Sequence, residues 1–221
     1  MIDRDSRGLL AVMYLCAAAV CAALVVFVSS PWIVWPSVVA VIWFCVWQAF
    51  FFHVPVREYS GGPGVITAVS DGKVVICEKA FEPEVLKRDC IQVSIYMNFF
   101  DVHANFWPLS GKLTAHRYCP GKHMLAFKPK ASLDNEHTWS VIEYGGSEIL
   151  FKQIAGGFAR RIVLHASDDQ LVTGGTQCGI IKFGSRIDYY FPLDTTIEVK
   201  VGDMVRACES VIARLSGVHN C

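Results

Sequence analysis

The residue pair Gly184-Ser185 is the strongest candidate for chemistry in this sequence. It follows glycines at positions 174, 175 and 179 and precedes an alternating apolar run at 189–192. A glycine before a serine leaves the hydroxyl sterically unhindered, so the pair predicts a serine held in a tight turn. Such a serine could attack a substrate or the carbonyl group of its own Gly184. An ordinary turn is the simplest alternative, and the rest of the chain must decide between these readings.

Two apolar segments begin the chain and would anchor whatever follows them. Residues 9–28 and 32–52 contain no charged side chain, and Ser29-Ser30-Pro31 separates them. Each segment has about 20 residues, enough for a helix to cross the ~30 Å hydrocarbon layer of a membrane. We therefore expect residues 1–53 to form a membrane-anchoring helical hairpin, with Pro36 tolerated in the first turn of the second helix. A cleaved signal peptide is the alternative for the first segment, although no small-x-small cleavage pattern precedes the second.

The charge pattern predicts an orientation and excludes one class of partner. Arg4, Arg7 and Arg57 flank the outer ends of the two spans, and the break between them carries no basic residue. The positive-inside rule then places both termini on the cytoplasmic face of the inner membrane. The chain has 20 basic and 20 acidic residues, which gives no electrostatic argument for binding nucleic acid.

Neither the cysteines nor the histidines have the spacing of a metal site. The nine cysteines include no CxxC pair, and a cytoplasmic location argues against disulfide bonds. Four histidines outside the motifs discussed below share no metal-ligand spacing and are expected to be superficial or structural: His116, His123, His137 and His165. We therefore expect no metal.

Residues 54–221 predict one mainly β domain with few helices. Short alternating runs separated by glycine-containing turns cover residues 64–69, 73–77, 91–97, 112–116, 140–143, 149–154, 180–183, 187–191 and 196–201. The helical candidates are residues 158–164 and a turn near 82–86. Residues 201–213 resemble the closing half of lipoyl- and biotinyl-type β-barrels, with Cys208 replacing the glycine of the second turn. No acceptor lysine motif is present, so this likeness concerns the scaffold alone.

Three separated motifs resemble those of the phosphatidylserine decarboxylases, most closely the short archaeal-type subfamily. They are the heptad Phe-Phe-Asp-Val-His-Ala-Asn at 99–105, Asp71-Gly72-Lys73, and Phe-Gly-Ser-Arg at 183–186. The likeness covers residues 50–215 in family order and includes the apolar hairpin. Two departures matter. His137 stands where arginine is usual, and Phe106 replaces the second histidine of the long-type enzymes, so His103 would have to serve alone.

The resemblance implies a proenzyme that cuts itself between Gly184 and Ser185. The Ser185 hydroxyl would attack the preceding carbonyl, with His103 as the base and Asp71 orienting it. Cleavage would give a β chain of residues 1–184 and an α chain of residues 185–221, that is 221 − 184 = 37 residues. The two chains would remain together as a heterodimer, with further oligomerisation left open.

The same resemblance implies a covalent cofactor and a lipid substrate. Ser185 would become a pyruvoyl group that forms a Schiff base with phosphatidylserine, and decarboxylation would yield phosphatidylethanolamine. Arg160 and Arg161 could hold the substrate phosphate, since guanidinium matches its geometry. Three lysines are weaker candidates for facing anionic headgroups: Lys128, Lys130 and Lys152. Asp101 is expected to hydrogen-bond its local turn.

Two other functions remain compatible with the residues. A non-enzymatic adaptor, made of a membrane hairpin and a lipoyl-like β domain, predicts a chain that stays intact at 24.5 kDa. A Ser-His-Asp hydrolase is the second alternative, but Gly184-Ser185 lacks the G-x-S-x-G elbow of that class. The proenzyme predicts two fragments, so the mass of the purified protein discriminates between these functions.

Overall fold

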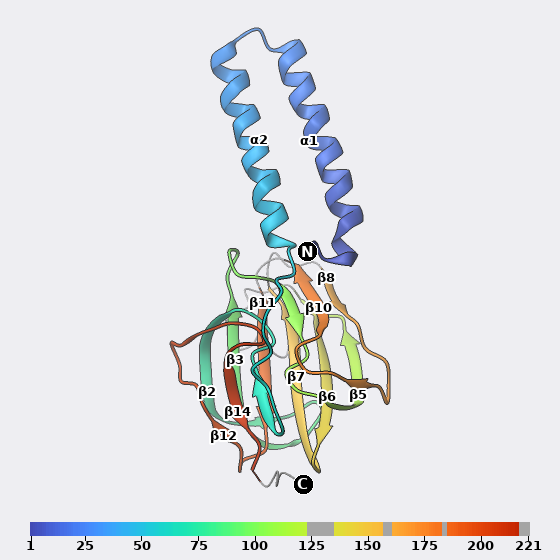
Figure 1. Cartoon of the computed structure of the whole chain (residues 1–221), viewed down its shortest axis with the longest axis vertical. Helices are drawn as coiled ribbons and strands as arrows, with labels where there is room; N and C mark the ends of the chain where they lie inside the picture. Colours follow the sequence, from blue (N-terminus) through green and yellow to red (C-terminus); the bar gives the residue numbers. More distant parts are fainter. Residues whose placement is uncertain (123–134, 157–160, 183–184, 217–221) are drawn as a thin grey trace. The chain divides into compact units, whose positions relative to one another are not determined.

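The chain divides into a helical unit and a β unit. The computed structural model describes residues 1–122, 135–156, 161–182 and 185–216 (Figure 1). Met1–Pro55 forms the first unit and Val56–Cys221 the second. Within the described ranges, both α-helices and the short 3-10 helix η1 (Arg4–Ser6) belong to the first unit, and the named strands belong to the second.

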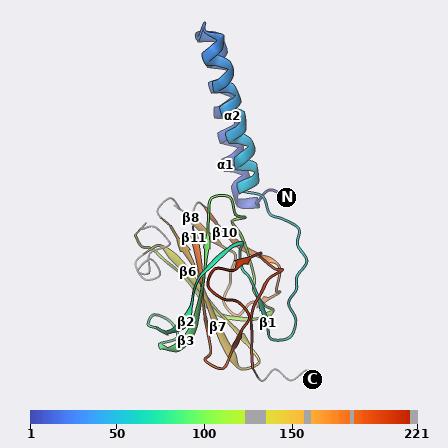
Figure 2. The ribbon, with the colours of Figure 1, turned by 90° about the vertical axis from the view of Figure 1, so that its left-hand side faces the viewer.

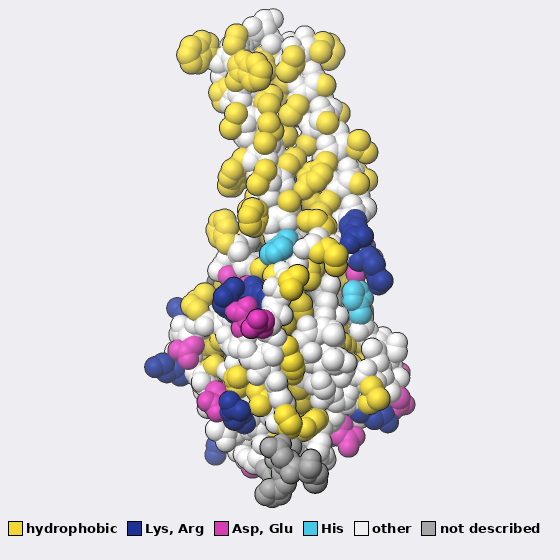
Figure 3. All heavy atoms as spheres, viewed as in Figure 1, with side chains coloured by type: hydrophobic (Ala, Val, Ile, Leu, Met, Phe, Trp, Pro, Cys, Tyr) yellow, Lys and Arg dark blue, Asp and Glu magenta, His cyan; other side chains and the backbone are white. Residues whose placement is uncertain are grey.

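The helical unit consists of α1 (Arg7–Phe27) and α2 (Pro31–Phe51). Each helix has 21 residues, which corresponds to a length of about 31 Å. Large apolar side chains cover its surface, and Trp32 is 89% and Phe27 82% exposed. The face shown in Figure 3 carries hydrophobic side chains along most of both helices. A soluble protein rarely exposes so continuous an apolar surface, so both length and exposure are consistent with membrane association.

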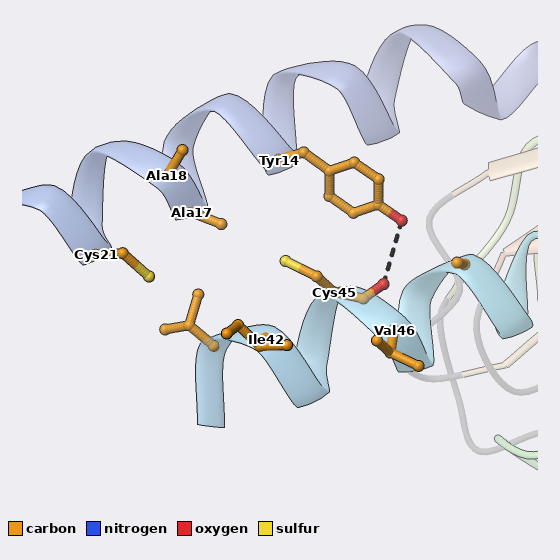
Figure 4. Close-up of a pocket in the computed structure, with 9 residues that line it drawn as sticks. Tyr14, Ala17, Ala18, Cys21, Ile42, Cys45 and Val46 are labelled. Carbon is orange, nitrogen blue, oxygen red and sulfur yellow. Dashed lines mark hydrogen bonds between the residues drawn. The ribbon is translucent and has the colours of Figure 1, made fainter. Parts of the chain in front are cut away.

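The two helices contact each other through small side chains. Tyr14 donates a hydrogen bond to the carbonyl oxygen of Cys45 at 3.2 Å, and Ala17 and Cys21 face α2 beyond it (Figure 4). Small residues between apolar helices allow close approach of their backbones, as in membrane-spanning pairs. Helix α2 begins at Pro31, so Pro36 lies in its second turn. The prediction of a first-turn proline was therefore wrong, and Pro36 removes one intrahelical hydrogen bond.

The start and the end of the helical unit lie side by side. Met1 donates its amino group to the Val54 carbonyl at 2.9 Å, and the Val54 amide donates back at 2.6 Å. The Asp3 amide also donates to the Phe52 carbonyl at 2.9 Å. The unit is thus a closed hairpin whose two ends would lie on the same side of a membrane.

The β unit is built on an eight-stranded antiparallel sheet. Its strand order is β13-β2-β3-β11-β7-β6-β5-β9. The part of this order from β2 to β5 can be followed in Figure 1. The strands are β2 (Gly72–Glu82), β3 (Arg88–Met97), β5 (Gly111–Cys119), β6 (His137–Tyr144), β7 (Ser147–Ala155), β9 (Leu171–Val172), β11 (Ser185–Phe191) and β13 (Met204–Val205). Two three-stranded sheets complete the unit: β1 (Val65–Thr67), β14 (Val211–Arg214) and β12 (Thr196–Ile197), and β4 (Ala104–Phe106), β10 (Gln177–Lys182) and β8 (Arg161–Leu164).

Both faces of the large sheet are buried, but they pack against different segments. One face contributes to the main apolar core together with residues of the two small sheets, such as Ile66, Ile181 and Ile212. The other face carries a smaller cluster of four side chains (Cys90, Val141, Leu150 and Tyr190), against which Val85 and Leu86 pack from the turn after β2. The β2–β3 hairpin that supplies this turn bends away from the rest of the sheet at its tip (Figure 2).

The expected fold class is confirmed: the β unit is mainly strand, and the structure describes no helix in it. The predicted helix at 158–164 is wrong where it can be compared. Arg161–Leu164 forms β8, which pairs antiparallel with β10, and residues 157–160 lie outside the described ranges. The three apolar residues at 162–164 are compatible with either a helix or a strand, and pairing with β10 makes them a strand. The expected turn near 82–86 is present, and Cys208 adopts a φ of 66° at its predicted turn.

Candidate functional site

Ser185 is the first residue of β11 and lies at one end of the large sheet. It pairs with Met97 of β3 on one side and with Ala155 of β7 on the other. Its side chain is fully buried, and its hydroxyl donates to the Met97 sulfur at 3.2 Å. Ser185 therefore lies within a strand, and the prediction that it sits in a turn is corrected. Phe183 and Gly184 lie outside the described residues.

The alternation of β11 assigns the Ser185 side chain to one face of the sheet. Successive strand residues point to opposite faces, so Ser185 shares its face with Ile187, Tyr189 and Phe191. These three residues belong to the main apolar core. The serine hydroxyl is thus directed toward the core side, where few groups could compete for its proton.

Asp71 reaches the same end of the sheet through the start of β2. Lys73 pairs with Tyr96, and one step further along this antiparallel pair brings Gly72 opposite Met97, the partner of Ser185. A side chain on Gly72 would collide with the Tyr96 carbonyl oxygen, so glycine is required after Asp71. The Asp71 carboxylate accepts a hydrogen bond from Arg57 Nη2 at 2.6 Å and another from the Ala207 amide at 2.8 Å.

His103 is fully buried on the approach to β4. Its Nδ1 lies 2.8 Å from the Asp101 carbonyl oxygen, which can only accept, so Nδ1 carries the ring proton. Its own carbonyl oxygen accepts from the Ile181 amide in β10, the strand that precedes Ser185. Burial lowers the pKa of His103 to about 4. At neutral pH the ring is therefore uncharged, with Nε2 as its basic nitrogen.

The turn between β3 and β4 connects Met97 to His103. The Asn98 amide donates to the Asp101 carboxylate at 2.8 Å, which confirms the expected local role of Asp101. Burial raises the pKa of Asp101, and the negative charge of Asp71 raises it further. Asp71 and the turn that connects Met97 to His103 thus lie at the same end of the sheet.

Two further polar residues belong to this region and were not singled out by the sequence. Arg57 has a side chain only 6% exposed, and its Nε and Nη1 have no hydrogen-bond partner in the described part of the chain. Asn105 is fully buried, and its Oδ1 accepts from Gln153 Nε2 at 2.7 Å. Asn105 belongs to the motif at 99–105, but Arg57 had no signal beyond its charge, because its contact with Asp71 is made in space.

The expected phosphate-binding residues are described in part. Arg161 is exposed at the start of β8, opposite Lys182, and lines an open pocket of about 360 Å³ with Arg117 and Thr138. Arg160 lies outside the described residues, as do Lys128 and Lys130.

The expectation that Lys152 faces anionic headgroups is wrong. Its ammonium group is completely buried and donates to Glu82 at 2.7 Å and to Glu84 at 2.6 Å. Residues 149–154 alternate between the two faces of β7, and the turn at 83–86 covers the face to which Lys152 points. The lysine is therefore a structural cation.

Comparison with known proteins identifies the family. A family model described as phosphatidylserine decarboxylase matches residues 44–213, which include Asp71, His103 and Ser185. The chain belongs to the phosphatidylserine decarboxylase family. A phosphatidylserine decarboxylase proenzyme of Porphyromonas gingivalis is 36% identical over 217 residues, covering 97% of this chain and 98% of the relative. Proenzymes with the same description from Amoebophilus asiaticus (42% identity, 77% of this chain and 76% of the relative) and Syntrophus aciditrophicus (39%, 84% and 86%) are also similar.

Membership of the phosphatidylserine decarboxylase family fits the two-part architecture. The similarity to the Porphyromonas gingivalis proenzyme extends over nearly the whole length of both chains, so it includes the apolar hairpin as well as the β unit. A decarboxylase acting on a membrane phospholipid has a use for an apolar anchor. The family therefore supports decarboxylation of phosphatidylserine and a role in phospholipid biosynthesis.

Proposed function

We propose that this chain is a short archaeal-type, pyruvoyl-dependent phosphatidylserine decarboxylase that activates itself by cleavage between Gly184 and Ser185. The observation that carries the proposal is the position of Ser185. Ser185 is fully buried and is the first residue of β11. Asp71 lies at the same end of the sheet, just before β2, and β3 ends there at Met97, from which the chain continues to His103. A serine that is buried on an apolar face cannot be hydrated as a surface serine is, which suggests a chemical role for its hydroxyl.

In the cleavage step, Ser185 Oγ attacks the carbonyl carbon of Gly184 while His103 Nε2 takes the hydroxyl proton. Nitrogen-to-oxygen transfer of the acyl group converts the peptide bond into an ester. Loss of a proton from Ser185 Cα then expels the carboxylate of Gly184, which becomes the end of the β chain. The dehydroalanine left at position 185 tautomerises to an imine, and one water molecule hydrolyses the imine to the pyruvoyl carbonyl with release of ammonia. At neutral pH the His103 ring is uncharged, so Nε2 can accept a proton, although burial, which lowers its pKa to about 4, also makes it a weaker base than a free histidine.

Asp71 and Arg57 act together in this proposal as a positioning pair. The Asp71 carboxylate is held by Arg57 at 2.6 Å and by the Ala207 amide at 2.8 Å, which fixes its position at the sheet end. The carboxylate would stabilise the imidazolium formed on His103 during proton transfer, offset in part by the charge of Arg57. The Asp101 carbonyl holds Nδ1–H and keeps Nε2 as the reacting nitrogen.

The environment of Ser185 fits a pyruvoyl group. Such a group supplies a carbonyl that captures the substrate amine and withdraws electrons as carbon dioxide leaves. Met97 and Ala155 flank Ser185, and all three side chains are fully buried, so bulk water is excluded from position 185. His103 would return a proton to the substrate carbon. Asn105, two residues further along the chain, provides a buried side-chain amide. Arg161, with Arg117, would bind the phosphate of the headgroup.

The proposed location is the inner membrane, with the β unit on the cytoplasmic face. The two ends of the helical hairpin are hydrogen-bonded to each other, so residue 1 and residue 54 would lie on the same side. Arg4 precedes the first helix, Arg7 is its first residue and Arg57 follows the second helix, which favours the cytoplasmic side. The α and β chains would remain associated because β11 is paired on both edges.

Denaturing mass spectrometry of the purified full chain tests this proposal. We expect a fragment of about 4 kDa from residues 185–221, scaled from 24.5 kDa for 221 residues, with a pyruvoyl-blocked amino terminus. Ser185→Ala should yield one intact chain without activity on phosphatidylserine. Ser140→Ala is the matched control, because Ser140 is also fully buried in the large sheet and its hydroxyl has no described partner. An intact wild-type chain would instead favour the membrane adaptor.

A further inference from the structure

The geometry points to a second site in this protein, a zinc site formed by Glu84, Cys119 and His137. Cys119 ends β5 and is paired with His137 at the start of β6, while Glu84 comes from the turn after β2. Glu84 Oε1 lies 3.1 Å from His137 Nε2 and 3.5 Å from Cys119 Sγ. One ligand atom from each residue lies within 4.8 Å of the other two. The three side chains therefore converge on one point.

The spacing of these atoms matches the edges of a zinc tetrahedron. With bonds of about 2.0–2.1 Å to nitrogen and oxygen and about 2.3 Å to sulfur, the edges are about 3.4 Å for N···O and about 3.6 Å for S···O. The two measured separations, 3.1 and 3.5 Å, lie close to these values. The third separation, between Cys119 Sγ and His137 Nε2, is within 4.8 Å.

The hydrogen bonds around the cluster orient the ligands as metal sites require. His137 Nδ1 lies 2.8 Å from the Asn135 carbonyl oxygen and so carries a proton, which leaves Nε2 directed at Glu84. Glu84 Oε2 accepts from Lys152 at 2.6 Å, which leaves Oε1 for the metal. A ligating histidine that donates its other N–H to a carbonyl and a hydrogen-bonded ligating carboxylate are both typical outer-shell arrangements.

A cation between His137 and Glu84 is required by the geometry itself. Nε2 lies 3.1 Å from both oxygens of the carboxylate, so either a proton or a metal ion must separate the lone pairs. A proton would give an ordinary imidazolium–carboxylate pair. The Cys119 thiol donates to the same carboxylate at 3.5 Å, and this places a sulfur beside the imidazole, a combination of ligands that zinc prefers.

The charges of the cluster can balance with zinc bound. Lys152 lies against Glu82 and Glu84, so two carboxylates share one ammonium group. Zinc would be bound by the neutral imidazole of His137 and by Cys119 as a thiolate. Two carboxylates and one thiolate would then face Lys152 and Zn²⁺, three negative charges against three positive. No uncompensated charge would remain at the buried end of the cluster.

The site is accessible and joins three elements of the fold. The Glu84 side chain is 30% exposed and Cys119 is half-buried, which provides an entry path and a fourth position for water. Zinc would staple the 83–86 turn to the ends of β5 and β6. It would also fix Asn135, whose Nδ2 donates at 2.7 Å to the carbonyl of Ala155, the partner of Ser185. The inference concerns the opposite face of the sheet and does not depend on self-cleavage.

Metal binding by the full chain in detergent tests this site. After chelator treatment and addition of Zn²⁺ alone, we expect about one zinc per chain to survive desalting, measured by elemental mass spectrometry. With Co²⁺ alone, we expect a thiolate-to-cobalt charge-transfer band. Cys119→Ser should abolish the band and weaken zinc binding at least about 100-fold, and His137→Gln should weaken it comparably. Cys77→Ser and His116→Gln are controls outside the cluster and should bind as the wild type does.

Two results would overturn the site. One is a wild-type chain that retains far less than one zinc, which would leave the cluster an ordinary ion pair. The other is a cobalt band that persists in Cys119→Ser or disappears in Cys77→Ser. If one variant fails to fold, the other cluster variant makes the assignment, and a wild-type chain that retains far less than one zinc overturns the site without any variant. Cleavage of the chain is measured in the same samples, and its presence or absence leaves the conclusion about zinc unchanged.

Discussion

The two faces of the eight-stranded sheet differ in chemistry although both are buried. On the face of Ser185, β11 contributes Ile187, Tyr189 and Phe191 to the main apolar core. On the other face the same strand contributes Arg186 and Asp188, which are 1% and 0% exposed. A single strand thus separates the main apolar core from a face that combines a small apolar cluster, which includes Tyr190, with buried charges.

The charged face is tolerated because its groups are paired. Arg186 binds Asp188 through two hydrogen bonds, at 2.5 and 2.9 Å, and donates to the Ser94 hydroxyl at 3.1 Å. Bidentate geometry of this kind offsets much of the cost of removing both charges from water. Burial acts differently on His103, on the approach to β4, where it lowers the pKa of the ring to about 4 and so favours the uncharged form. The comparison teaches that buried charge is kept in this domain where an opposite charge is adjacent, whereas burial favours the neutral form of the proposed base.

The largest expected effect is on the apolar face. His103→Gln removes the proposed base, and we expect self-cleavage to slow by about 100-fold to 10,000-fold. The time course of fragment formation, followed by denaturing mass spectrometry after expression, measures this. His116→Gln is the control. His116 belongs to β5, which does not pair with the strand of Ser185, and its Nδ1 lies 3.0 Å from an Asp168 carboxylate oxygen. An unchanged rate of cleavage in His103→Gln would show that His103 is not the base of self-cleavage.

The next effect concerns the charged face. Asp188→Ala leaves Arg186 buried without its main partner, and we expect the free energy of unfolding to fall by about 3–5 kcal/mol. Glu198→Ala provides the exposed counterpart, because Arg214 and Glu198 are 53% and 41% exposed, and should cost less than about 1 kcal/mol. Urea denaturation of both variants in a Ser185→Ala background keeps cleavage from confusing the comparison. Equal losses would show that the buried pair has no special weight.

The pH dependence of stability tests the neutrality of His103. Its pKa is lowered from 6.5 to about 4 in the folded chain, so below pH 6.5 the unfolded chain binds the proton first. Stability is therefore lost as the pH falls from 6.5 to about 4, by up to about 3 kcal/mol. In the Ser185→Ala background, His103→Gln should flatten this part of the urea-midpoint profile. If the urea midpoint falls equally steeply with pH with and without His103→Gln, a group other than His103 causes the loss of stability.

The smallest effect is expected at the exposed Arg161. Arg161→Ala removes one charged contact to the proposed phosphate, and we expect KM for phosphatidylserine in mixed micelles to rise roughly threefold to tenfold, with kcat nearly unchanged. Arg214→Ala removes an exposed cation that does not line the pocket and serves as the control. A fall in kcat without a change in KM would assign Arg161 a different role.

Local patterns sufficed for the class of the fold and for most strands. Residues 187–191 alternate as β11 does, and the turn near 82–86 follows from its own residues. The same reasoning failed at β8, because three apolar residues suit a helix or a strand until a neighbour is known. It also failed for Ser185, since a glycine-serine pair suggests a turn and only pairing with β3 and β7 makes it part of a strand.

The sequence by itself determined that this protein has an apolar hairpin and a β domain, and that Asp71, His103 and Ser185 are its candidate reactive residues. Composition and local periodicity carry the hairpin and the β domain because they depend on residues close together in the chain, whereas the three reactive residues follow from the resemblance of separated motifs to a known family. The tertiary structure alone decided that Lys152 is a buried partner of Glu82 and Glu84. It also decided that Arg57 holds Asp71, and that Glu84, Cys119 and His137 meet. Each of these contacts joins residues distant in sequence, and strand order and register bring them together.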